Sequence, residues 1–484
     1  MNYISTRGNA QSVSASQAVI NGIAPDGGLY VPESFPALDL DFDRLKDLSY
    51  QEIANEIFSA FFTDYTEEEI AAIVAGSYGE QWDDDTIVPI HQEGNKFYLE
   101  LFHGPTIAFK DIALQALPRL LSTAAKKHGL KSKLLILAAT SGDTGTAAMA
   151  GFGDVPGTEI VVFYPEVGVS EIQKQQMITE AAKNAHVIAI TGNFDDAQTA
   201  VKTLFADDEL GKELAAGKFQ FSSANSINIG RLIPQIVYYI YGYAQLVKSG
   251  AIKAGDEIDI VVPTGNFGNI MASYYASRIG LPVREFIVAS NENNVLTDFF
   301  NTGVYDRKRP FTVSTSPAMD ILVSSNLERL LYFASDATEV ANYMEDLTEK
   351  GSYTVSPEVR ENLAKFKAGF ASNEEVAATI KEVFEDTHYL LDPHTAVARF
   401  VAPSFDDGTV QLIASTASPF KFPQTVLEVL GESAKHERVA LDQLALISGV
   451  PVPEQVAKLF TKEVRHTLVI DPEEIKETLK ETIL

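Results

Sequence analysis

The chain has 484 residues and no cysteine. This absence excludes disulfide bonds, thiolate metal sites and a cysteine nucleophile together, and we expect no metal. The sequence also lacks an apolar run long enough to cross a membrane, and residues 1–20 lack the charged-then-apolar pattern of a signal peptide. We therefore expect a cytoplasmic protein without a membrane partner.

Positive charge is scarce. The chain carries 38 Lys and Arg against 66 Asp and Glu, for a formal net charge of −28. Nucleic acids and anionic membranes are bound through a surplus of Lys and Arg, so neither is expected as a partner. Small anions are not excluded, because backbone N–H groups and one or two cations can hold them locally whatever the total charge.

The remaining composition is that of a globular protein, with 45% hydrophobic residues, 31 Gly and 21 Pro. The length predicts two or three domains. Apolar runs typical of buried strands alternate with helical patterns, which predicts an α/β fold with parallel sheets. The expected strands are 131–140, 158–165, 186–191, 219–225, 257–264, 284–290 and 410–416, and the expected helices include 144–151, 170–184 and 229–248.

Two regions differ from this pattern. Residues 1–90 have a glycine-rich start and two helical stretches, 43–62 and 66–77, and we interpret them as a small N-terminal α/β domain. Residues 91–484 then form the large region. Within it, the acid-rich sequence from about 325 to 392 predicts a helical insertion before the last strands.

The segment HGPTIAFKD, residues 103–111, places Lys110 behind a Gly-Pro turn and the aromatic Phe109. A lysine that forms a Schiff base needs a fixed stem and a partly desolvated amine, so that enough of it is neutral to attack an aldehyde. Ile107, Ala108 and Phe109 can supply that apolar surrounding. Taken alone, a lysine in such a position is far more often an ordinary lysine at a helix start, and only the further motifs downstream favour the interpretation of Lys110 as a Schiff-base lysine.

Three further segments combine small and hydroxyl residues at strand ends. The sequence SGDTG, residues 141–145, exposes backbone N–H groups and a helix start to an anion, although a plain capped turn is the alternative. PTGNFGN, residues 263–269, can wrap a phosphate or form a simple left-handed turn. ASTASPFKF, residues 414–422, offers a hydroxyl to a ring nitrogen and Lys421 to an anion, or is a strand end before a Pro turn.

Together these motifs resemble the threonine synthase family over nearly the whole chain, in its yeast and enterobacterial branch. The N-terminal YISTRG (3–8) and GIAPDGGLY (22–30) resemble that family's first domain, and ELF (100–102) with HGPTIAFKD its cofactor-lysine segment. Further similar segments are SGDTG, NSINIGR (225–231), PTGNFGN, SPAMDI (316–321) and LDPHTAVA (391–398).

The resemblance implies a pyridoxal 5′-phosphate (PLP) enzyme with two α/β subdomains of the tryptophan synthase β-subunit type. It implies a carbon–oxygen lyase that converts O-phospho-L-homoserine and water to L-threonine and phosphate, the last step of threonine biosynthesis in the aspartate family. The branch also implies a monomer. A γ-elimination needs carbanion character at Cα and proton loss at Cβ, which fits an electron-accepting ring beside one mobile base.

Residue roles carry over by motif. Lys110 resembles the Schiff-base lysine and proton shuttle, Asp143 lies nearest the cofactor's phenolic oxygen, and Thr416 faces its ring nitrogen. The cofactor phosphate falls to the backbone of Gly265, Asn266, Phe267, Gly268 and Asn269. Substrate binding falls to Ser141, Gly142 and Thr144 for the carboxylate, and to Arg231 and Lys421 for the phosphate.

Four positions need separate comment. His103 and His394 can assist proton transfer, but a structural histidine is the alternative for both. Ser418 and Phe420 depart from the family, which more often has His and Ala there, and this puts the shape of the substrate-phosphate site in question.

Other functions stay open at this point. A related PLP enzyme such as a serine/threonine dehydratase shares the lysine and the loops but does not need the N-terminal domain. A non-catalytic paralogue that binds a phosphorylated metabolite is expected to lose the lysine. A pyridine-nucleotide oxidoreductase shares the α/β pattern, but its glycine fingerprint is absent.

Overall fold

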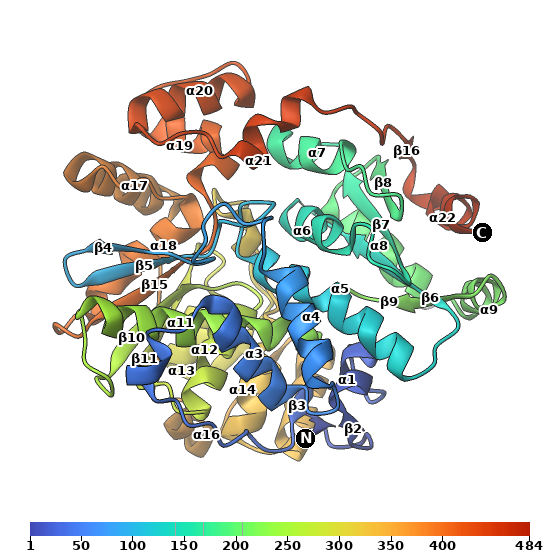
Figure 1. The fold of residues 1–484 in the computed structure, drawn as a ribbon, viewed down its shortest axis with the longest axis horizontal. Coiled ribbons are helices and arrows are strands. Elements are labelled where there is room, and N and C mark those ends of the chain that lie inside the picture. Colours follow the sequence, from blue (N-terminus) through green and yellow to red (C-terminus); the bar gives the residue numbers. More distant parts are fainter. Residues whose placement is uncertain (141, 168, 206) are drawn as a thin grey trace.

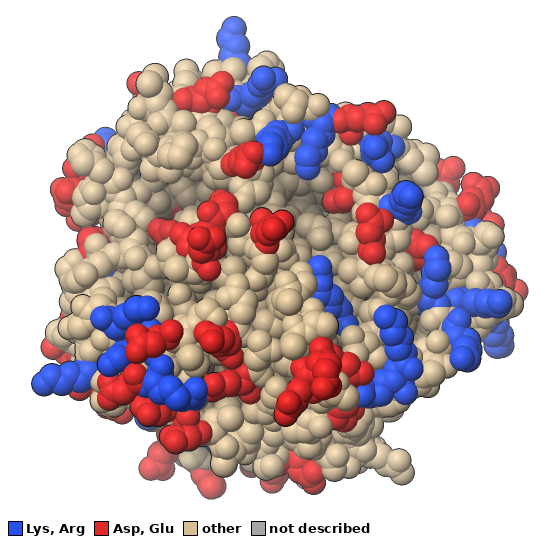
Figure 2. All heavy atoms as spheres, viewed as in Figure 1, with Lys and Arg blue, Asp and Glu red and all other residues tan. Residues whose placement is uncertain are grey.

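A computed structural model describes residues 1–140, 142–167, 169–205 and 207–484. Two separate β-sheets, each flanked by helices, make up most of the molecule (Figure 1). The predicted alternation of strands and helices is confirmed. In the described part of the chain no helix is long and apolar enough to cross a membrane. On the face shown in Figure 2, Lys and Arg are interspersed among Asp and Glu.

The larger sheet has six strands in the order β14-β11-β10-β15-β5-β4. All neighbours are parallel except β4 and β5, which are antiparallel, so the sheet is mixed at one edge. Every residue of the central strand β10 is buried, as expected for a parallel strand covered on both faces. The strands are β4 (Ile90–Glu93), β5 (Lys96–Glu100), β10 (Ile258–Pro263), β11 (Val283–Ser290), β14 (Phe366–Phe370) and β15 (Gln411–Ser415).

The second sheet is wholly parallel, with five strands in the order β16-β8-β7-β6-β9. The edge strand β16 comes from the C-terminal part of the chain, which the sequence patterns did not assign to a sheet. The C-terminal helix α22 (Ile475–Ile483) lies beside the same sheet (Figure 1), where Lys480 pairs with Glu213 at 3.0 Å. The strands are β6 (Lys133–Ala139), β7 (Thr158–Pro165), β8 (Ala185–Ile190), β9 (Phe219–Ser222) and β16 (Val469–Ile470).

The N-terminal segment forms a three-stranded antiparallel sheet with four helices. The stretch expected as one helix over 43–62 is divided, because Ser49 starts a new helix with a capping box. The elements are β1 (Asn2–Ser5), β2 (Val13–Ser14), α1 (Ala15–Asn21), β3 (Tyr30–Pro32), α2 (Phe42–Leu45), α3 (Tyr50–Phe61) and α4 (Glu67–Ser77).

Two predicted helices are shorter than expected. The stretch 229–248 is divided before Pro234, whose ring fits the start of a helix, and the helix expected over 170–184 ends at Ile178. The corresponding elements are α6 (Asp143–Phe152), α7 (Glu171–Ile178), α10 (Ile229–Leu232) and α11 (Pro234–Ser249). The other helices before residue 303 are α5 (Lys110–Lys127), α8 (Phe194–Phe205), α9 (Asp208–Ala216), α12 (Gly268–Arg278) and α13 (Val295–Thr302).

The region 325–392 is mainly helical, but the sequence 366–370 within it is a strand, not a helix. This strand, β14, pairs in parallel with β11 and buries Phe366 and Ala368. Its side chains alternate between buried and more exposed, as in an edge strand. Five residues are too few for the two-residue period of a strand to be recognised in the sequence. The elements are β12 (Val304–Asp306), α14 (Leu327–Ala334), α15 (Ala337–Glu349), β13 (Ser352–Thr354), α16 (Pro357–Asn362), α17 (Asn373–Thr387), α18 (Pro393–Val401), α19 (Pro423–Val429), α20 (Glu437–Ser448) and α21 (Glu454–Ala457).

Candidate active site

The lysine motif and the 414–422 motif lie side by side, although they are far apart in the sequence. The Phe109 N–H donates to the Thr416 carbonyl at 2.8 Å, and the Ser418 N–H donates to the Ile107 carbonyl at 3.1 Å. Lys110 is the first residue of α5, so its side chain starts directly beside the end of β15. This arrangement brings together two of the segments singled out from the sequence.

The turn before Lys110 is held by Asp111. Its carboxylate accepts from the Thr106 N–H at 2.8 Å and from the Thr106 hydroxyl at 2.6 Å. These bonds support Ile107, whose φ of 53° is costly for a β-branched residue. Burial raises the pKa of Asp111 to about 6, against the opposing effect of the Thr106 hydrogen bonds. Asp111 thus fixes the backbone from which Lys110 projects.

The Lys110 side chain belongs to a group of three charged side chains. The Lys110 Nζ lies 3.2 Å from the Asp143 Oδ2, and the Lys421 Nζ lies 3.3 Å from the Asp143 Oδ1. The Lys421 Nζ also donates to the Thr106 carbonyl at 2.8 Å, and its side chain is fully buried. The structure therefore places the predicted residues Lys110, Asp143 and Lys421 in one buried group.

This group has opposite effects on its members. Burial lowers the pKa of the Lys110 amine; Asp143 opposes that effect, while the cations Lys421 and Arg231 add to it. Burial alone would raise the pKa of the Asp143 carboxyl, but Lys110 and Lys421 hold it well below its usual range. The result is a carboxylate that stays ionised beside an amine whose neutral form is favoured.

In the SGDTG segment, α6 begins at Asp143 and Gly142 directly precedes it. Gly142 has a φ of 139°, and a Cβ at this position would lie 2.3 Å from the Gln173 side chain. Gln173, on α7, donates to the Asp143 Oδ1 at 2.7 Å, and no signal in the sequence marked this residue. Thr144 is half-buried in the first turn of α6. Ser141 lies outside the described residues.

The PTGNFGN loop, after β10, presents a set of hydrogen-bond donors. Among the residues described, none accepts from the main-chain N–H groups of Gly265, Asn266 or Phe267. Phe267 adopts a left-handed conformation with a φ of 64°, and Gly268 starts α12. A Cβ on Gly265 would lie 3.0 Å from the Ala318 carbonyl oxygen, so the backbone packs closely there. The loop thus offers N–H donors together with a helix N-terminus.

Asn269 extends this donor set. Its side-chain oxygen accepts from the Tyr239 hydroxyl, and its buried Nδ2 has no hydrogen-bond partner among the described residues. A phosphate carries only acceptor oxygens, which suits backbone N–H groups and an unpaired amide nitrogen. The residues present therefore fit the phosphate of PLP, and the buried Lys110 amine fits its aldehyde.

Thr416 lies at the end of β15, where its N–H donates to the Thr395 hydroxyl at 3.2 Å. Asp392 in turn accepts from the Thr395 N–H at 3.0 Å and contacts the His394 Nδ1 at 2.8 Å. The Ala318 N–H donates to the His394 Nε2 at 3.2 Å. His394 is thereby buried between two partners, which agrees with a structural role.

Arg231 lies on α10 and is 4% exposed. Its Nη1 donates to the Ala224 carbonyl at 2.9 Å, while its buried Nε has no partner among the described residues. Burial lowers the pKa of Arg231 to about 10. A buried guanidinium with an unused donor is suited to an anion, and Arg231 is near enough to influence the Lys110 amine.

The two departures from the family motif are both buried. The Ser418 hydroxyl accepts from the Phe420 N–H at 3.2 Å, so Ser418 caps the short helical turn before Lys421. Phe420 packs into a hydrophobic cluster that includes Ile107 and Ile172. Neither residue is among the described residues that the Lys110 amine contacts, which are Asp143 and the Phe109 ring.

His103 is the other histidine considered from the sequence. Its Nδ1 lies 2.6 Å from Asp83 and its Nε2 lies 2.9 Å from Glu100. Burial opposes protonation, but these two carboxylates together raise the pKa of His103 to about 9. A protonated histidine held on both sides agrees with a structural role.

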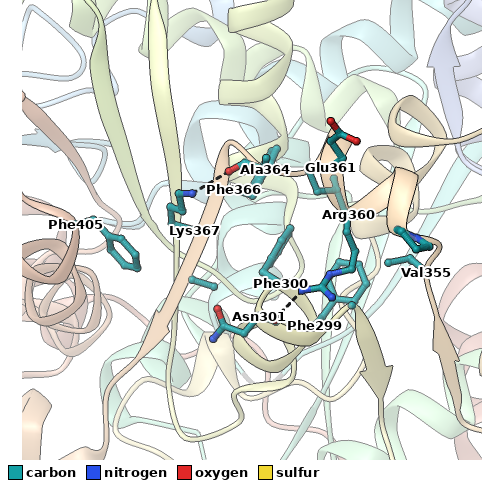
Figure 3. A pocket seen from close by; sticks show the side chains of 14 residues that line it. Phe299, Phe300, Asn301, Val355, Arg360, Glu361, Ala364, Phe366, Lys367 and Phe405 are labelled. Atoms are coloured by element: carbon teal, nitrogen blue, oxygen red, sulfur yellow. Dashed lines mark hydrogen bonds between the residues drawn. The ribbon is translucent and has the colours of Figure 1, made fainter.

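A cavity of about 560 Å³ lies elsewhere, beside β14 and α16. Figure 3 shows Phe299, Phe300 and Phe366 at this cavity, and the Arg360 guanidinium reaching the Asn301 carbonyl at 3.1 Å. It shares no lining residue with the group around Lys110. The chemistry considered above therefore does not involve this cavity.

Comparison with known proteins agrees with the site. Residues 2–78 match the family model "Threonine synthase N terminus", and residues 89–415 match the model "Pyridoxal-phosphate dependent enzyme". Threonine synthase of Schizosaccharomyces pombe is 38% identical, with 88% of each chain covered. Human "Threonine synthase-like 1" is 40% identical over 87% of this chain, which spans 59% of that relative's length.

The solved structure of PLP-bound threonine synthase from Brucella melitensis has a TM-score of 0.90 and 34% identity, and it covers 100% of this chain and 99% of its own. This similarity confirms the predicted fold class. The family model also confirms PLP as the cofactor. With a buried lysine, a loop that offers N–H donors to an anion and this similarity over the full length, the chain belongs to the threonine synthase family of PLP-dependent lyases.

Proposed function

We propose that the protein converts O-phospho-L-homoserine and water to L-threonine and phosphate. The observation that carries the proposal is the buried Lys110 amine, with its pKa lowered by burial and its position set by Asp143. Family membership supports the same reaction. The alternative is a related PLP enzyme that catalyses elimination from, or dehydration of, another amino acid. The two functions are distinguished by which substrate the protein converts.

The reaction breaks the Cγ–O bond of the substrate, and phosphate leaves with the electron pair. Protons must first leave Cα and Cβ, and protons return to Cγ and Cα, while the hydroxyl of water adds at Cβ. PLP, when bound, supplies the electron sink that makes these proton losses possible. The protein must therefore provide one mobile base near both carbons and sites for three anions: the cofactor phosphate, the substrate carboxylate and the substrate phosphate.

Lys110 is the base in this proposal. An amine acts as a general base only when neutral, and burial with Lys421 and Arg231 nearby favours that form. Asp143 stays ionised and accepts a hydrogen bond from the amine at 3.2 Å, which holds the amine in place. Lys110 removes protons from Cα and Cβ and returns protons to Cγ and Cα, and its stem is held by the turn that Asp111 stabilises.

The anion-binding groups are assigned by their donors. The backbone of Gly265 to Asn269 holds the cofactor phosphate, and the Thr416 hydroxyl faces the ring nitrogen. Asp143 lies near the phenolic oxygen. The start of α6, with Ser141, Gly142 and Thr144, takes the substrate carboxylate.

Two cations are proposed for the departing phosphate, and they differ in their present contacts. Arg231 has an unused buried Nε. Lys421 already contacts Asp143 and the Thr106 carbonyl. Arg231 is therefore the stronger phosphate ligand of the two, and Lys421 supports it while holding Asp143 in place.

Other parts of the proposal concern the whole chain. Residues 1–90 are assigned to an N-terminal domain and residues 91–484 to the PLP-binding region, with an insertion over about 325–392. We propose a cytoplasmic monomer, and sedimentation of the purified holoenzyme would test the oligomeric state.

The decisive experiment is a parallel assay of threonine and phosphate release from O-phospho-L-homoserine by the PLP-loaded protein. Equal release of both products is expected. If the protein releases neither but forms ammonia and a 2-oxo acid from serine or threonine, it is a dehydratase. Borohydride reduction followed by peptide mass analysis should place the cofactor on Lys110.

A further inference from the structure

Arg329, in the first turn of α14, is a fully buried guanidinium. Its neighbour Glu328 pairs with Arg7 at 2.9 Å, and Arg329 makes no ion pair with any described residue. A buried charge without a counter-ion is costly unless its donors are all directed at acceptors. The role of the buried Arg329 guanidinium is therefore to be found in the acceptors that its N–H groups bond.

The donors of Arg329 reach three segments. Its Nε donates to the Tyr30 carbonyl at 3.0 Å, at the start of β3 in the N-terminal segment. Its Nη2 donates to the Ile227 carbonyl, in the segment that leads to Arg231. Its Nη1 donates to the Asn326 Oδ1. One side chain thus joins the N-terminal segment to two parts of the large region.

Asn326 passes this contact to the phosphate-binding loop. Its N–H and Nδ2 both donate to the Asn266 carbonyl, at 3.1 Å and 2.9 Å. Arg329 has only donors, so it can bond the Asn326 side-chain amide only at its oxygen, and this directs the amide nitrogen toward the loop. Ser324 adds a bond at 2.6 Å to the Gly265 carbonyl.

The direction of the loop N–H groups follows from these bonds. In a planar trans peptide the C=O and the following N–H point in opposite directions. Holding the Gly265 and Asn266 carbonyls toward residues 324–326 therefore turns the Asn266 and Phe267 N–H groups to the other side. Those are two of the N–H groups for which no described residue is an acceptor.

We propose that Arg329 is a positioning residue that, through Asn326, orients the backbone N–H donors of the phosphate-binding loop and couples them to the N-terminal segment. This inference depends on the proposed function, since that function assigns the loop to the cofactor phosphate. The loop is then pre-organised only while the N-terminal segment is docked. In this proposal Arg329 and Asn326 act through the loop and contact neither the substrate nor the reacting atoms.

The test compares cofactors with and without a phosphate. Full-length protein freed of cofactor is titrated with PLP and with pyridoxal, for the wild type and for Arg329→Met and Asn326→Asp. The Asp variant keeps an acceptor for Arg329 but loses the Nδ2 donor to Asn266, so it should fold even if Arg329→Met does not. Arg7→Gln is the matched control, because Arg7 also joins the N-terminal segment to α14 but has no contact with the loop.

We expect both variants to weaken PLP binding about tenfold or more, with pyridoxal binding unchanged within about twofold, and Arg7→Gln to preserve the wild-type preference. Unchanged PLP affinity in Asn326→Asp, or equal losses for PLP and pyridoxal, would overturn the inference. If the wild type itself fails to prefer PLP, the assignment of the loop in the proposed function fails and the inference with it. Threonine formation by the wild type is assayed separately, so the two failures are distinguishable.

Discussion

At the scale of single residues, Lys110 is in an environment that balances two opposing requirements. Its amine must be neutral to act as a nucleophile or base, yet it must be held in one position. Burial and the nearby cations favour neutrality, and the 3.2 Å contact to Asp143 holds the position. Asp143 can hold the amine because Lys421 and Gln173 also contact its carboxylate, so the carboxylate remains paired when Lys110 is neutral.

Lys110→Ala is expected to fold, because Asp143 keeps Lys421 and Gln173 as partners. The variant should lose covalent attachment of PLP and show essentially no turnover. Borohydride fixation with peptide mass analysis and the threonine assay measure the two effects. Substantial residual activity in a well-folded variant would contradict the role of Lys110 as the base.

Lys421→Met should raise the pKa of the Lys110 amine, because it removes a buried cation beside it. The rate at which the cofactor-free protein attaches PLP depends on the neutral amine, so its pH profile should move to higher pH. We also expect weaker binding of the phosphorylated substrate while PLP is retained.

Lys127→Met is the control for this comparison, because Lys127 pairs with Glu69 at the end of α5. An attachment profile for Lys421→Met that matches the control would show that Lys421 does not influence Lys110. Loss of PLP rather than of substrate binding would show that Lys421 serves the cofactor phosphate.

His103 should make the stability of the protein depend on pH. Its folded pKa of about 9 lies above the unfolded value, so its stabilising effect is complete below about pH 6.5 and is lost as the pH rises through about 9. The shift corresponds to roughly 3 kcal/mol at most. His103→Gln should therefore lower the free energy of unfolding at pH 6 much more than at pH 10.

Urea unfolding of both proteins at the two pH values measures the difference. An equal loss at pH 6 and pH 10 would mean that lost packing, and not the protonated ring between Asp83 and Glu100, explains the effect.

At the scale of elements, the active site depends on how α6 begins. A Cβ on Gly142 would meet the Gln173 side chain at 2.3 Å, and Gln173 holds Asp143. Gly142→Ala should therefore displace Gln173 and lower kcat/KM by about a hundredfold or more, in line with the effect of small misplacements near reacting groups.

Gly255→Ala is the matched control for Gly142→Ala. It has a φ of 93° and no heavy atom within 4 Å of a built Cβ, so it carries backbone strain without a steric clash. We expect it to lose some stability, about 1 kcal/mol, and to keep full activity. Steady-state kinetics and thermal unfolding of the pair separate the two effects, and equal kinetics for both variants would contradict the role of Gln173.

Elements and motifs were predictable where the signal is local. The central strands β7 and β10 each contain an apolar run, and Lys110 and the loops after β6 and β10 stand in short motifs. The edge strand β14 and the added strand β16 were not predictable, because each is short and depends on a distant partner for its pairing. Gln173 and Arg329 were missed for the same reason, since their partners lie far away in the sequence.

At the scale of the whole molecule, the hydrophobic core of the N-terminal segment is continuous with the larger sheet and with one face of strands β6 to β8. One cluster joins Phe58 of α3 to Leu117 of α5 and Tyr239 of α11. A separate cluster packs on the second sheet and includes Ile470 of β16 and Leu479 of α22. Cooperative unfolding should follow these clusters, and the N-terminal segment should unfold together with the larger sheet.

Phe58→Ala tests this arrangement, because Phe58 is completely buried and its removal should cost about 3–5 kcal/mol. Hydrogen exchange read by mass spectrometry should show amide protection falling by similar free energies in α3, α5 and α11, and less in β16 and α22, whose buried residues belong to the other cluster. Leu479→Ala is the matched control, since Leu479 is also fully buried but lies in the other cluster. It should lower protection in the second sheet first. If Phe58→Ala instead loosens α3 and leaves α11 unchanged, the N-terminal segment is an independent unit, and its coupling to the phosphate-binding loop through Arg329 would have to act without a shared core.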